Sequence, residues 1–297
     1  MLDLRGNIPP VLTPLHPDGR LDRAAVTRLT AHFLDGGVSG LFVLGSCGEG
    51  AMLSARTRAA VIEAYREEVD GRVPVLAGVP EFGTRSAVES AERAMAAGAD
   101  AVVVMAPQYF PYGGWEPVAE HLHTVASNVG VPTVLYNLPS VTQNPITPAV
   151  VAAVGGLPNV IALKDSSADW DAYIALADAA GRHGLAVFQG AERFIARSLA
   201  RGADGVVAGI SNIDPAAVTG LVAAQASGDT VTADRLQRHV DDLCALYGAG
   251  FWLGALKAAV SLLGLCGPAT CEPSPAVDAE ALDRIKAVLD GAEQSVG

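Results

Sequence analysis

The sequence contains three lysines, Lys164, Lys257 and Lys286, whereas its other permanently cationic side chains are arginines. Only Lys164 follows directly on a run of apolar, strand-type residues, 160–163. Lysine, unlike arginine, can lose its proton and form an imine with a carbonyl compound when its ammonium group is desolvated. Lys164 is therefore the first candidate for a covalent nucleophile.

Two other stretches could supply groups that work beside this amine. Tyr136 ends the apolar run 133–136. This run comes before the apolar run that leads to Lys164. Neighbouring strands lie about 4.8 Å apart, so the phenol and the amine can point into one space, where a tyrosine can pass protons to and from a carbonyl oxygen. The loop 45–50 offers backbone N–H groups and the Ser46 hydroxyl to a carboxylate, because its glycines allow close approach.

Other kinds of chemistry fit the pattern less well. No histidine falls at a strand end beside Cys47, so the base that would activate a cysteine nucleophile is missing. His121 and His123 are two residues apart on a predicted helix and face different ways, and we expect no metal site. Glu49 fits an anchor for its own loop better than a catalyst.

The elements that must position these residues form a regular alternation. Short apolar runs recur along the chain, and each is followed by a segment whose apolar residues have helical spacing. The predicted strands are 7–12, 41–44, 75–77, 101–105, 133–136, 160–164, 186–188 and 205–208. The predicted helices are 23–35, 55–69, 84–97, 115–127, 148–154, 169–181, 192–201 and 216–227.

Eight strand–helix units predict an α/β fold, a closed (β/α)₈ TIM barrel over residues 1–227 rather than an open doubly wound sheet. Buried parallel strands appear as continuous apolar runs joined by crossover helices, as they do here. Beyond this point we expect a C-terminal helical extension, residues 228–297, with helices at 230–247, 251–263 and 276–292. Barrel enzymes carry reacting groups at the C-terminal ends of their strands, where Lys164 and Tyr136 fall.

Composition limits the class of partner and the compartment. A net charge of −12 opposes binding to nucleic acid or to an anionic membrane. The sequence has no signal-peptide pattern at its start and no apolar run of membrane-spanning length. Four cysteines without C-x-x-C spacing indicate a reducing, cytoplasmic compartment. We therefore expect a small-molecule substrate.

Three motifs resemble the signatures of the dihydrodipicolinate synthase / N-acetylneuraminate lyase family. They are Gly-Ser-Cys-Gly-Glu at 45–49, Tyr-Asn-Leu-Pro at 136–139 and Leu-Lys-Asp-Ser at 163–166. Weaker similarities lie in Pro-x-x-Thr-Pro at 10–14, Gly-Ala-Asp-Gly at 202–205 and Leu-Lys at 256–257. The resemblance covers nearly the whole chain in the right order.

The resemblance implies a pyruvate-type Schiff base on Lys164, with Tyr136 as general acid/base and no cofactor. It implies that Ser46 lies in a proton relay and, with the backbone at Cys47, binds the carboxylate of a 2-oxo acid. Tyr109 would complete the relay, in many members by reaching into the site of a neighbouring subunit. The family is typically a homotetramer built as a pair of dimers.

Several further residues are expected to line the substrate pocket. Gly190 and Val207 lie at or beside the ends of the last two predicted strands. Side chains that could bind substrate hydroxyl groups are Ser166, Gln143, Gln189 and Glu192.

The sequence departs from the family pattern at two positions. Cys47 stands where members usually have threonine, and a thiol is the weaker donor. Val141 stands where true dihydrodipicolinate synthases carry an arginine that holds the carboxylate of aspartate semialdehyde, so a second carboxylate lacks its bidentate partner.

The departure at Val141 favours a lyase or aldolase that cleaves, or forms by condensation, a 4-hydroxy-2-oxo acid, giving pyruvate and an aldehyde with a hydroxylated tail. Two alternatives keep the imine: a dihydrodipicolinate synthase-type condensation, and a dehydratase or hydratase-aldolase acting on a 2-oxo sugar acid. A third is a catalytically silent barrel that binds a small acid, and Cys47 keeps this alternative open.

Overall fold

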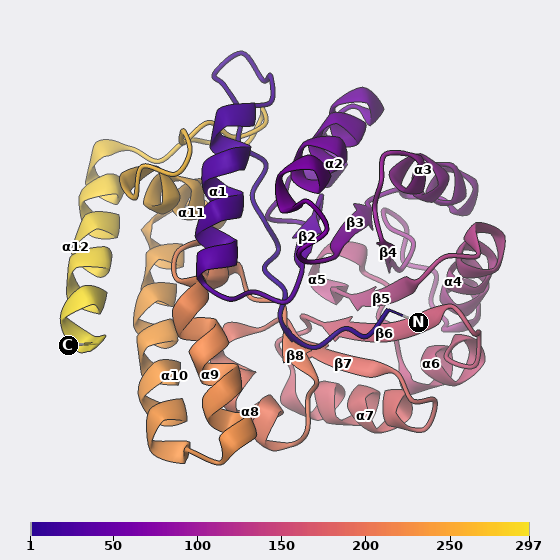
Figure 1. Cartoon of the computed structure of the whole chain (residues 1–297). Coiled ribbons are helices and arrows are strands. Elements are labelled where there is room, and N and C mark those ends of the chain that lie inside the picture. Colours follow the sequence, from indigo (N-terminus) through magenta and orange to yellow (C-terminus); the bar gives the residue numbers. More distant parts are fainter. Residues whose placement is uncertain (1, 297) are drawn as a thin grey trace.

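The computed structural model describes the backbone of residues 2–296 and the side chains of residues 2–292. Its centre is a ring of parallel strands with helices around the outside (Figure 1). The strands are β1 (Gly6–Asn7), β2 (Leu41–Val43), β3 (Val75–Val79), β4 (Ala101–Met105), β5 (Thr133–Asn137), β6 (Val160–Asp165), β7 (Ala186–Gln189) and β8 (Gly205–Val206).

The strands follow the order β1-β8-β7-β6-β5-β4-β3-β2, and the two ends of this sheet also meet. The N–H of Phe42 donates to the carbonyl of Pro9 at 2.9 Å, and the N–H of Val11 donates to the carbonyl of Phe42 at 2.9 Å. These bonds close the sheet on itself, so the predicted (β/α)₈ barrel is confirmed.

The first and last strands are shorter than predicted. The segment 7–12 contains Pro9 and Pro10, which lack an N–H, so a regular ladder stops at Asn7 and only an isolated bridge joins Pro10 to Phe42. The last strand ends at Val206, and the N–H of Gly209 donates to the Glu192 carboxylate at 2.9 Å instead of continuing the sheet.

Most barrel helices begin and end close to their predicted limits. The Asp22 and Ser54 side chains accept hydrogen bonds from the first turns of the helices that follow them, which fixes where those helices start. The barrel helices are α1 (Arg23–Asp35), α2 (Ala55–Val69), α3 (Thr84–Ala96), α4 (Glu116–Val129), α6 (Pro148–Val154), α7 (Trp170–Gly181), α8 (Ile195–Ala200) and α9 (Pro215–Ser227). A further short helix, α5 (Pro139–Thr142), follows β5 and was not predicted.

Alternation along β6 decides which side chains enter the ring. Ala162 packs with the residues that fill the barrel interior, whereas Leu163 packs with the core between the strands and the surrounding helices. Because successive strand side chains point to opposite faces, Lys164 faces the interior and Asp165 faces outward. Lys164 indeed borders the same internal space as Phe42, Phe188 and Val207.

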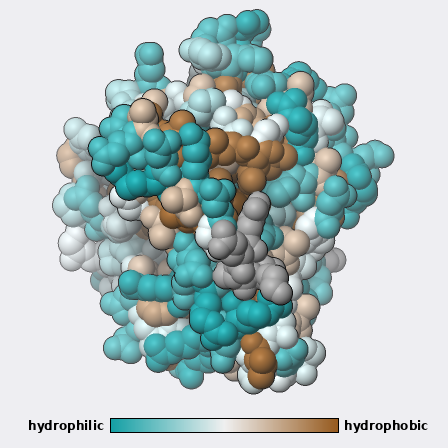
Figure 2. All heavy atoms as spheres, turned by 90° about the vertical axis from the view of Figure 1, so that its left-hand side faces the viewer, coloured by the Kyte–Doolittle hydropathy of each residue, from teal (hydrophilic) through white to brown (hydrophobic). Residues whose placement is uncertain are grey.

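The last three helices are α10 (Thr230–Cys244), α11 (Trp252–Leu262) and α12 (Ala279–Val296). Helix α10 packs against α9, and α12 packs against α10 and α11 (Figure 1). The last helix starts three residues later than predicted, because Asp278 accepts the N–H of Ala281 at 2.8 Å and so marks its beginning. The side of the molecule that carries these helices is mostly hydrophilic, and its largest hydrophobic area lies in the upper half of the view (Figure 2).

A helix that crosses a membrane must be both long and apolar. Within residues 2–296, no single helix is both long and apolar enough, although 230–249 and 252–262 together meet the requirement as a pair bent by 116°.

Candidate active site

Lys164 and Tyr136 lie side by side at the ends of β6 and β5, where they are paired in register. The Lys164 Nζ lies 3.9 Å from the centre of the Tyr136 ring and 5.0 Å from the centre of the Phe42 ring. The lysine is only 4% exposed, and no carboxylate of the described residues lies within ion-pair distance of it. The amine is therefore buried against aromatic faces without a counter-ion.

Asp165, the next residue, does not serve as that counter-ion. Its carboxylate accepts hydrogen bonds from the Asn137 amide at 2.7 Å and from the Ser167 hydroxyl at 2.8 Å. Burial raises the pKa of Asp165 above its ordinary value, and these two hydrogen bonds oppose the shift. The carboxylate ties the end of β6 to the end of β5 and so holds the strand that carries the lysine.

Gly190 makes the room that the lysine occupies. A Cβ atom at this position would lie 2.0 Å from the Ser166 Oγ and 2.9 Å from the Lys164 Cε. Any side chain here would displace the reactive amine or the Ser166 hydroxyl, so the position requires glycine.

The amine opens onto a cavity of about 400 Å³ at the mouth of the barrel. The structure brings most of the predicted site residues to its walls: Lys164, Tyr136, Ser46, Cys47, Ser166, Gly190 and Val207. Among the described residues, Lys164 is the one cation on these walls and Glu192 the one carboxylate. Val141 also borders the cavity, at the position where an arginine would have added a second cation.

Cys47 is buried in the loop that contributes Ser46. Burial raises the pKa of the Cys47 thiol to about 12, although the nearby charge of Lys164 lowers it in part. Cys47 therefore remains a neutral thiol near pH 7. The thiolate, and not the neutral thiol, is the reactive form of cysteine.

The carboxylate of Glu192 is held at the opposite wall. It accepts the N–H of Gly209 at 2.9 Å and the hydroxyl of Tyr247 at 3.3 Å through the same oxygen, Oε1. Burial raises the pKa of Tyr247 well above its ordinary value, with a smaller contribution from the Glu192 charge, so the phenol stays protonated and donates.

Sequence reasoning missed several wall residues, among them Ser140 and two residues of the C-terminal extension, Tyr247 and Trp252. No local pattern marks them, because they lie on helical segments well beyond the last strand. Of the proposed hydroxyl-binding residues, Gln143 and Gln189 are not on the cavity wall. The Gln189 Oε1 accepts the N–H of Ala191 at 2.8 Å, and the side chain faces away from the ring interior because the preceding Phe188 faces into it.

Tyr109 also lies apart from the cavity within its own chain. Its side chain is 67% exposed and packs against Phe82 and Phe110, with ring centres 6.3 Å and 4.7 Å away. Its backbone has φ +81°, a left-handed conformation that is unfavourable for a residue with a bulky side chain. The structure thus presents this ring at the surface.

A second cavity, of about 200 Å³, adjoins the first. Ser46, Tyr136, Val141 and Trp252 border both spaces. Its other walls are mainly apolar and include Leu44, Met52, Val79, Met105 and Phe251.

A buried lysine without a counter-ion, placed at the end of a barrel strand with a phenol against it, is suited to imine formation with a carbonyl substrate. Fold and site together define a class I, Schiff-base lyase on a (β/α)₈ barrel.

Comparison with known proteins identifies the family. The family model of the dihydrodipicolinate synthetase family matches residues 3–292. An uncharacterized DapA-like lyase of Halobacterium salinarum is 36% identical over 271 residues, 90% of this chain and 87% of that protein. A probable 2-dehydro-3-deoxy-D-pentonate aldolase of Escherichia coli, YjhH, is 30% identical over 295 residues, 97% of each protein.

Among solved structures, the chain is similar to YagE of Escherichia coli K12, a family member determined in complex with pyruvate. The TM-score is 0.93 at 29% identity, covering 97% of this chain and 98% of that one. The chain belongs to the dihydrodipicolinate synthetase family, and it is a class I, pyruvate-dependent enzyme of the lyase/aldolase type.

Proposed function

We propose that this enzyme cleaves a 4-hydroxy-2-oxo acid with an uncharged, hydroxylated tail to pyruvate and an aldehyde, or runs the reverse condensation. One observation carries the proposal: the described residues that line the cavity beside Lys164 and Tyr136 include no second cation. It suits a substrate whose one carboxylate binds near Ser46 and whose remainder is neutral.

Lys164 starts the reaction. Its free amine attacks the C2 ketone. The Tyr136 phenol donates its proton to the departing hydroxyl, so loss of water leaves an iminium ion and a phenolate. Tyr136 accepts the proton of the C4 hydroxyl as the C3–C4 bond breaks, and the bonding electrons move into the iminium to give an enamine and the aldehyde. Protonation of the enamine at C3, followed by addition of water at C2, releases pyruvate and restores the amine.

Ser46 and Cys47 are assigned to the carboxylate end of the substrate. The Ser46 hydroxyl borders the cavity next to Tyr136, which is consistent with a role in relaying the proton that the phenol gains or loses. The backbone N–H of Cys47 would bind the carboxylate, so that its neutral thiol is not required as a donor.

The far wall is assigned to the tail of the substrate. Ser166 and Glu192, with Ser140 and Tyr247, offer donors and acceptors to hydroxyl groups, while Gly190 and Val207 leave space between them. The Glu192 carboxylate would repel a second carboxylate, which argues against aspartate semialdehyde as the partner. The relative named as a sugar-acid aldolase supports the same choice.

A second copy of the chain is proposed to complete the site. Tyr109 and its neighbours Phe82 and Phe110 are exposed aromatic residues, and the apolar cavity beside Tyr136 is open for a ring from another subunit. This supports a homotetramer built from two dimers, in which Tyr109 acts across an interface. Light scattering of the wild-type chain and of Tyr109→Ala, with mixed-subunit activity assays, tests this assembly.

We also propose that the enzyme acts in the cytoplasm, without nucleic-acid or membrane partners. The free thiols of Cys47, Cys244, Cys266 and Cys271 are consistent with a reducing compartment.

Borohydride reduction in the presence of pyruvate tests the imine directly. We expect a stable adduct on Lys164, located by peptide mapping; an unmodified Lys164 would contradict the mechanism and favour a silent, acid-binding barrel.

Product analysis then separates the possible reactions of the imine. Release of pyruvate from neutral hydroxylated 4-hydroxy-2-oxo acids supports the aldolase, whereas preferred condensation of pyruvate with aspartate semialdehyde, or dehydration of a sugar acid, supports the alternatives.

A further inference from the structure

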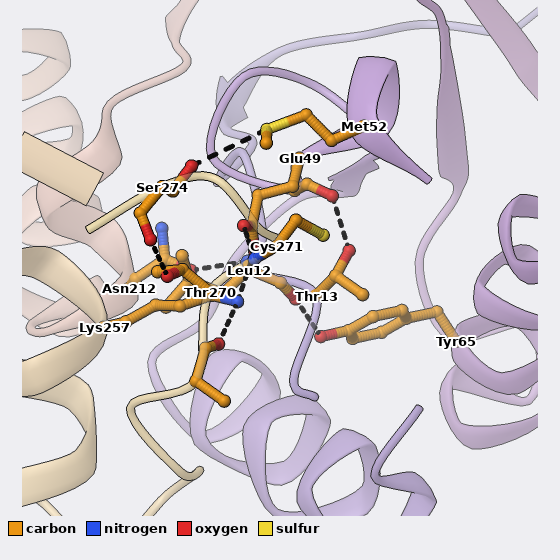
Figure 3. A network of polar contacts seen from close by, with 12 residues as sticks. Leu12, Thr13, Glu49, Met52, Tyr65, Asn212, Lys257, Thr270, Cys271 and Ser274 are labelled. Atoms are coloured by element: carbon orange, nitrogen blue, oxygen red, sulfur yellow. Dashed lines mark hydrogen bonds and ion pairs between the residues drawn. The ribbon is translucent and has the colours of Figure 1, made fainter. Parts of the chain in front are cut away.

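Glu49 connects the loop that carries Ser46 to the C-terminal extension. Its carboxylate forms an ion pair with Lys257 of α11, and both side chains are fully buried. The second carboxylate oxygen accepts the N–H of Cys271 at 2.6 Å, across 222 residues of sequence (Figure 3). Lys257 in turn donates to the carbonyl of Ala269 at 2.7 Å.

The position of Glu49 is tightly coupled to that of Ser46. The N–H of Glu49 donates to the carbonyl of Ser46 at 3.2 Å, and the N–H of Gly50 donates to the carbonyl of Gly45 at 3.3 Å. Glu49 is left-handed, with φ +55°, and a Cβ atom at Gly50 would lie 2.0 Å from the carbonyl oxygen of Leu44. The turn therefore has little freedom to move Ser46 without moving the Glu49 carboxylate.

The barrel itself holds this loop only through neutral backbone acceptors. The Thr13 hydroxyl donates to the carbonyl of Gly48 at 2.6 Å, and Arg58 donates to the carbonyl of Gly50 at 3.3 Å. Among the described residues, the ion pair of this loop is formed with Lys257, which does not line the cavity.

We propose that Lys257 and Glu49 are positioning residues: through them the C-terminal extension sets the place of Ser46, and hence carboxylate binding, in the barrel mouth. This inference rests on the proposed role of Ser46. A buried ion pair is a poor means of adding stability compared with an apolar pair of the same shape, whereas its directional contacts can select one arrangement of a loop.

The test uses the double variant Glu49→Gln/Lys257→Met, which removes both buried charges but keeps the shapes and the acceptor for the Cys271 N–H. We expect a folded chain in which borohydride trapping of Lys164 at low pyruvate concentration slows at least tenfold. Alkylation of Cys47, which lies in the same loop, should rise at least tenfold and provides a readout independent of the reaction. Ile285→Ala, which leaves the ion pair intact but opens a space in the buried side of α12, is the matched control for general loosening of the extension.

A folded double variant with wild-type trapping and wild-type protection of Cys47 overturns the inference, as does an equal change in Ile285→Ala. If the double variant does not fold, Glu49→Asp replaces it: it keeps both charges and withdraws the carboxylate, and the same changes are expected. Absence of trapping in the wild-type chain overturns both the proposed function and this inference. Normal trapping in the wild type and in the folded variants contradicts the loop inference alone.

Discussion

Lys164 and Lys257 are both buried, yet their surroundings differ in one respect that decides what each can do. Lys257 is fully buried with an ion-pair partner, Glu49, and a carbonyl acceptor. Lys164, at 4% exposure, has two aromatic faces near its amine and no carboxylate partner among the described residues. The Lys257 amine is thus held by partners on two sides, whereas the Lys164 amine keeps its donors for a bound substrate.

The comparison explains why burial alone does not identify a nucleophile. The Lys257 amine is engaged on two sides, so it is held away from any substrate. The Lys164 amine faces a cavity of about 400 Å³ and has Tyr136 against it. The same side chain therefore serves structure in one region and chemistry in the other, according to its partners.

Replacing Lys164 should give the largest change in activity. Lys164→Met removes the nucleophile, and we expect turnover to fall by at least about 10⁴-fold because the described cavity walls carry no other amine. Thermal stability should stay the same or rise, since no ion pair is lost. Pyruvate-release assays and thermal melts measure the two effects; residual turnover near the wild-type rate would rule out the imine on this residue.

The same substitution at the other buried lysine, Lys257, should have the opposite effect on stability. Lys257→Met leaves the Glu49 carboxylate buried and unpaired, which should lower the free energy of unfolding by about 3–5 kcal/mol. Lys286→Met is the control: its amine contacts Asp283 at 3.1 Å on the surface, and its loss should change stability by less than about 1 kcal/mol. Urea unfolding of the two variants measures the difference. Equal stabilities would mean that losing the buried partner of Glu49 costs no more than losing a surface ion pair.

Removing the Tyr136 hydroxyl tests whether this residue carries the proton beside Lys164. Tyr136→Phe keeps the ring against Lys164 but removes the proton carrier, so turnover should fall by about 10²- to 10³-fold. Imine trapping with pyruvate should decline less than turnover, because the amine remains in place. A variant with unchanged turnover would show that another group carries the proton.

The smallest expected effect concerns the second nucleophile in the barrel mouth. The pKa of Cys47 lies at about 12 in the folded chain, above its ordinary value of 9.0, so the reactive thiolate is about 10³-fold scarcer at pH 8 than for an ordinary thiol. Iodoacetamide should therefore label Cys47 very slowly between pH 7 and pH 9, but at an ordinary rate after unfolding in urea. Rapid labelling of the folded chain would mean that Cys47 competes with Lys164 as a nucleophile.

Local signals in the sequence were sufficient for the fold and for the central residue. Asp22 and the apolar spacing after it predicted the helix found at Arg23–Asp35, because a cap and a helical periodicity act within a few residues. The apolar run before Lys164 predicted a strand ending near the lysine, and alternation along β6 directs that side chain into the ring. Eight such units leave a closed barrel as the arrangement that buries every strand.

Only the tertiary structure decided which distant residues meet at the site. Tyr247 and Trp252 reach the cavity from the extension, and Lys257 meets Glu49 across the same boundary. Tyr109 was expected to complete the relay, in many family members by reaching into the site of a neighbouring subunit. Within its own chain it lies at the surface, and its part in the site stays a prediction. Such contacts depend on how whole helices pack against the barrel, and no pattern within a few neighbouring residues encodes that packing. The sequence therefore determined where the amine stands, and the packing of the extension determined what surrounds it.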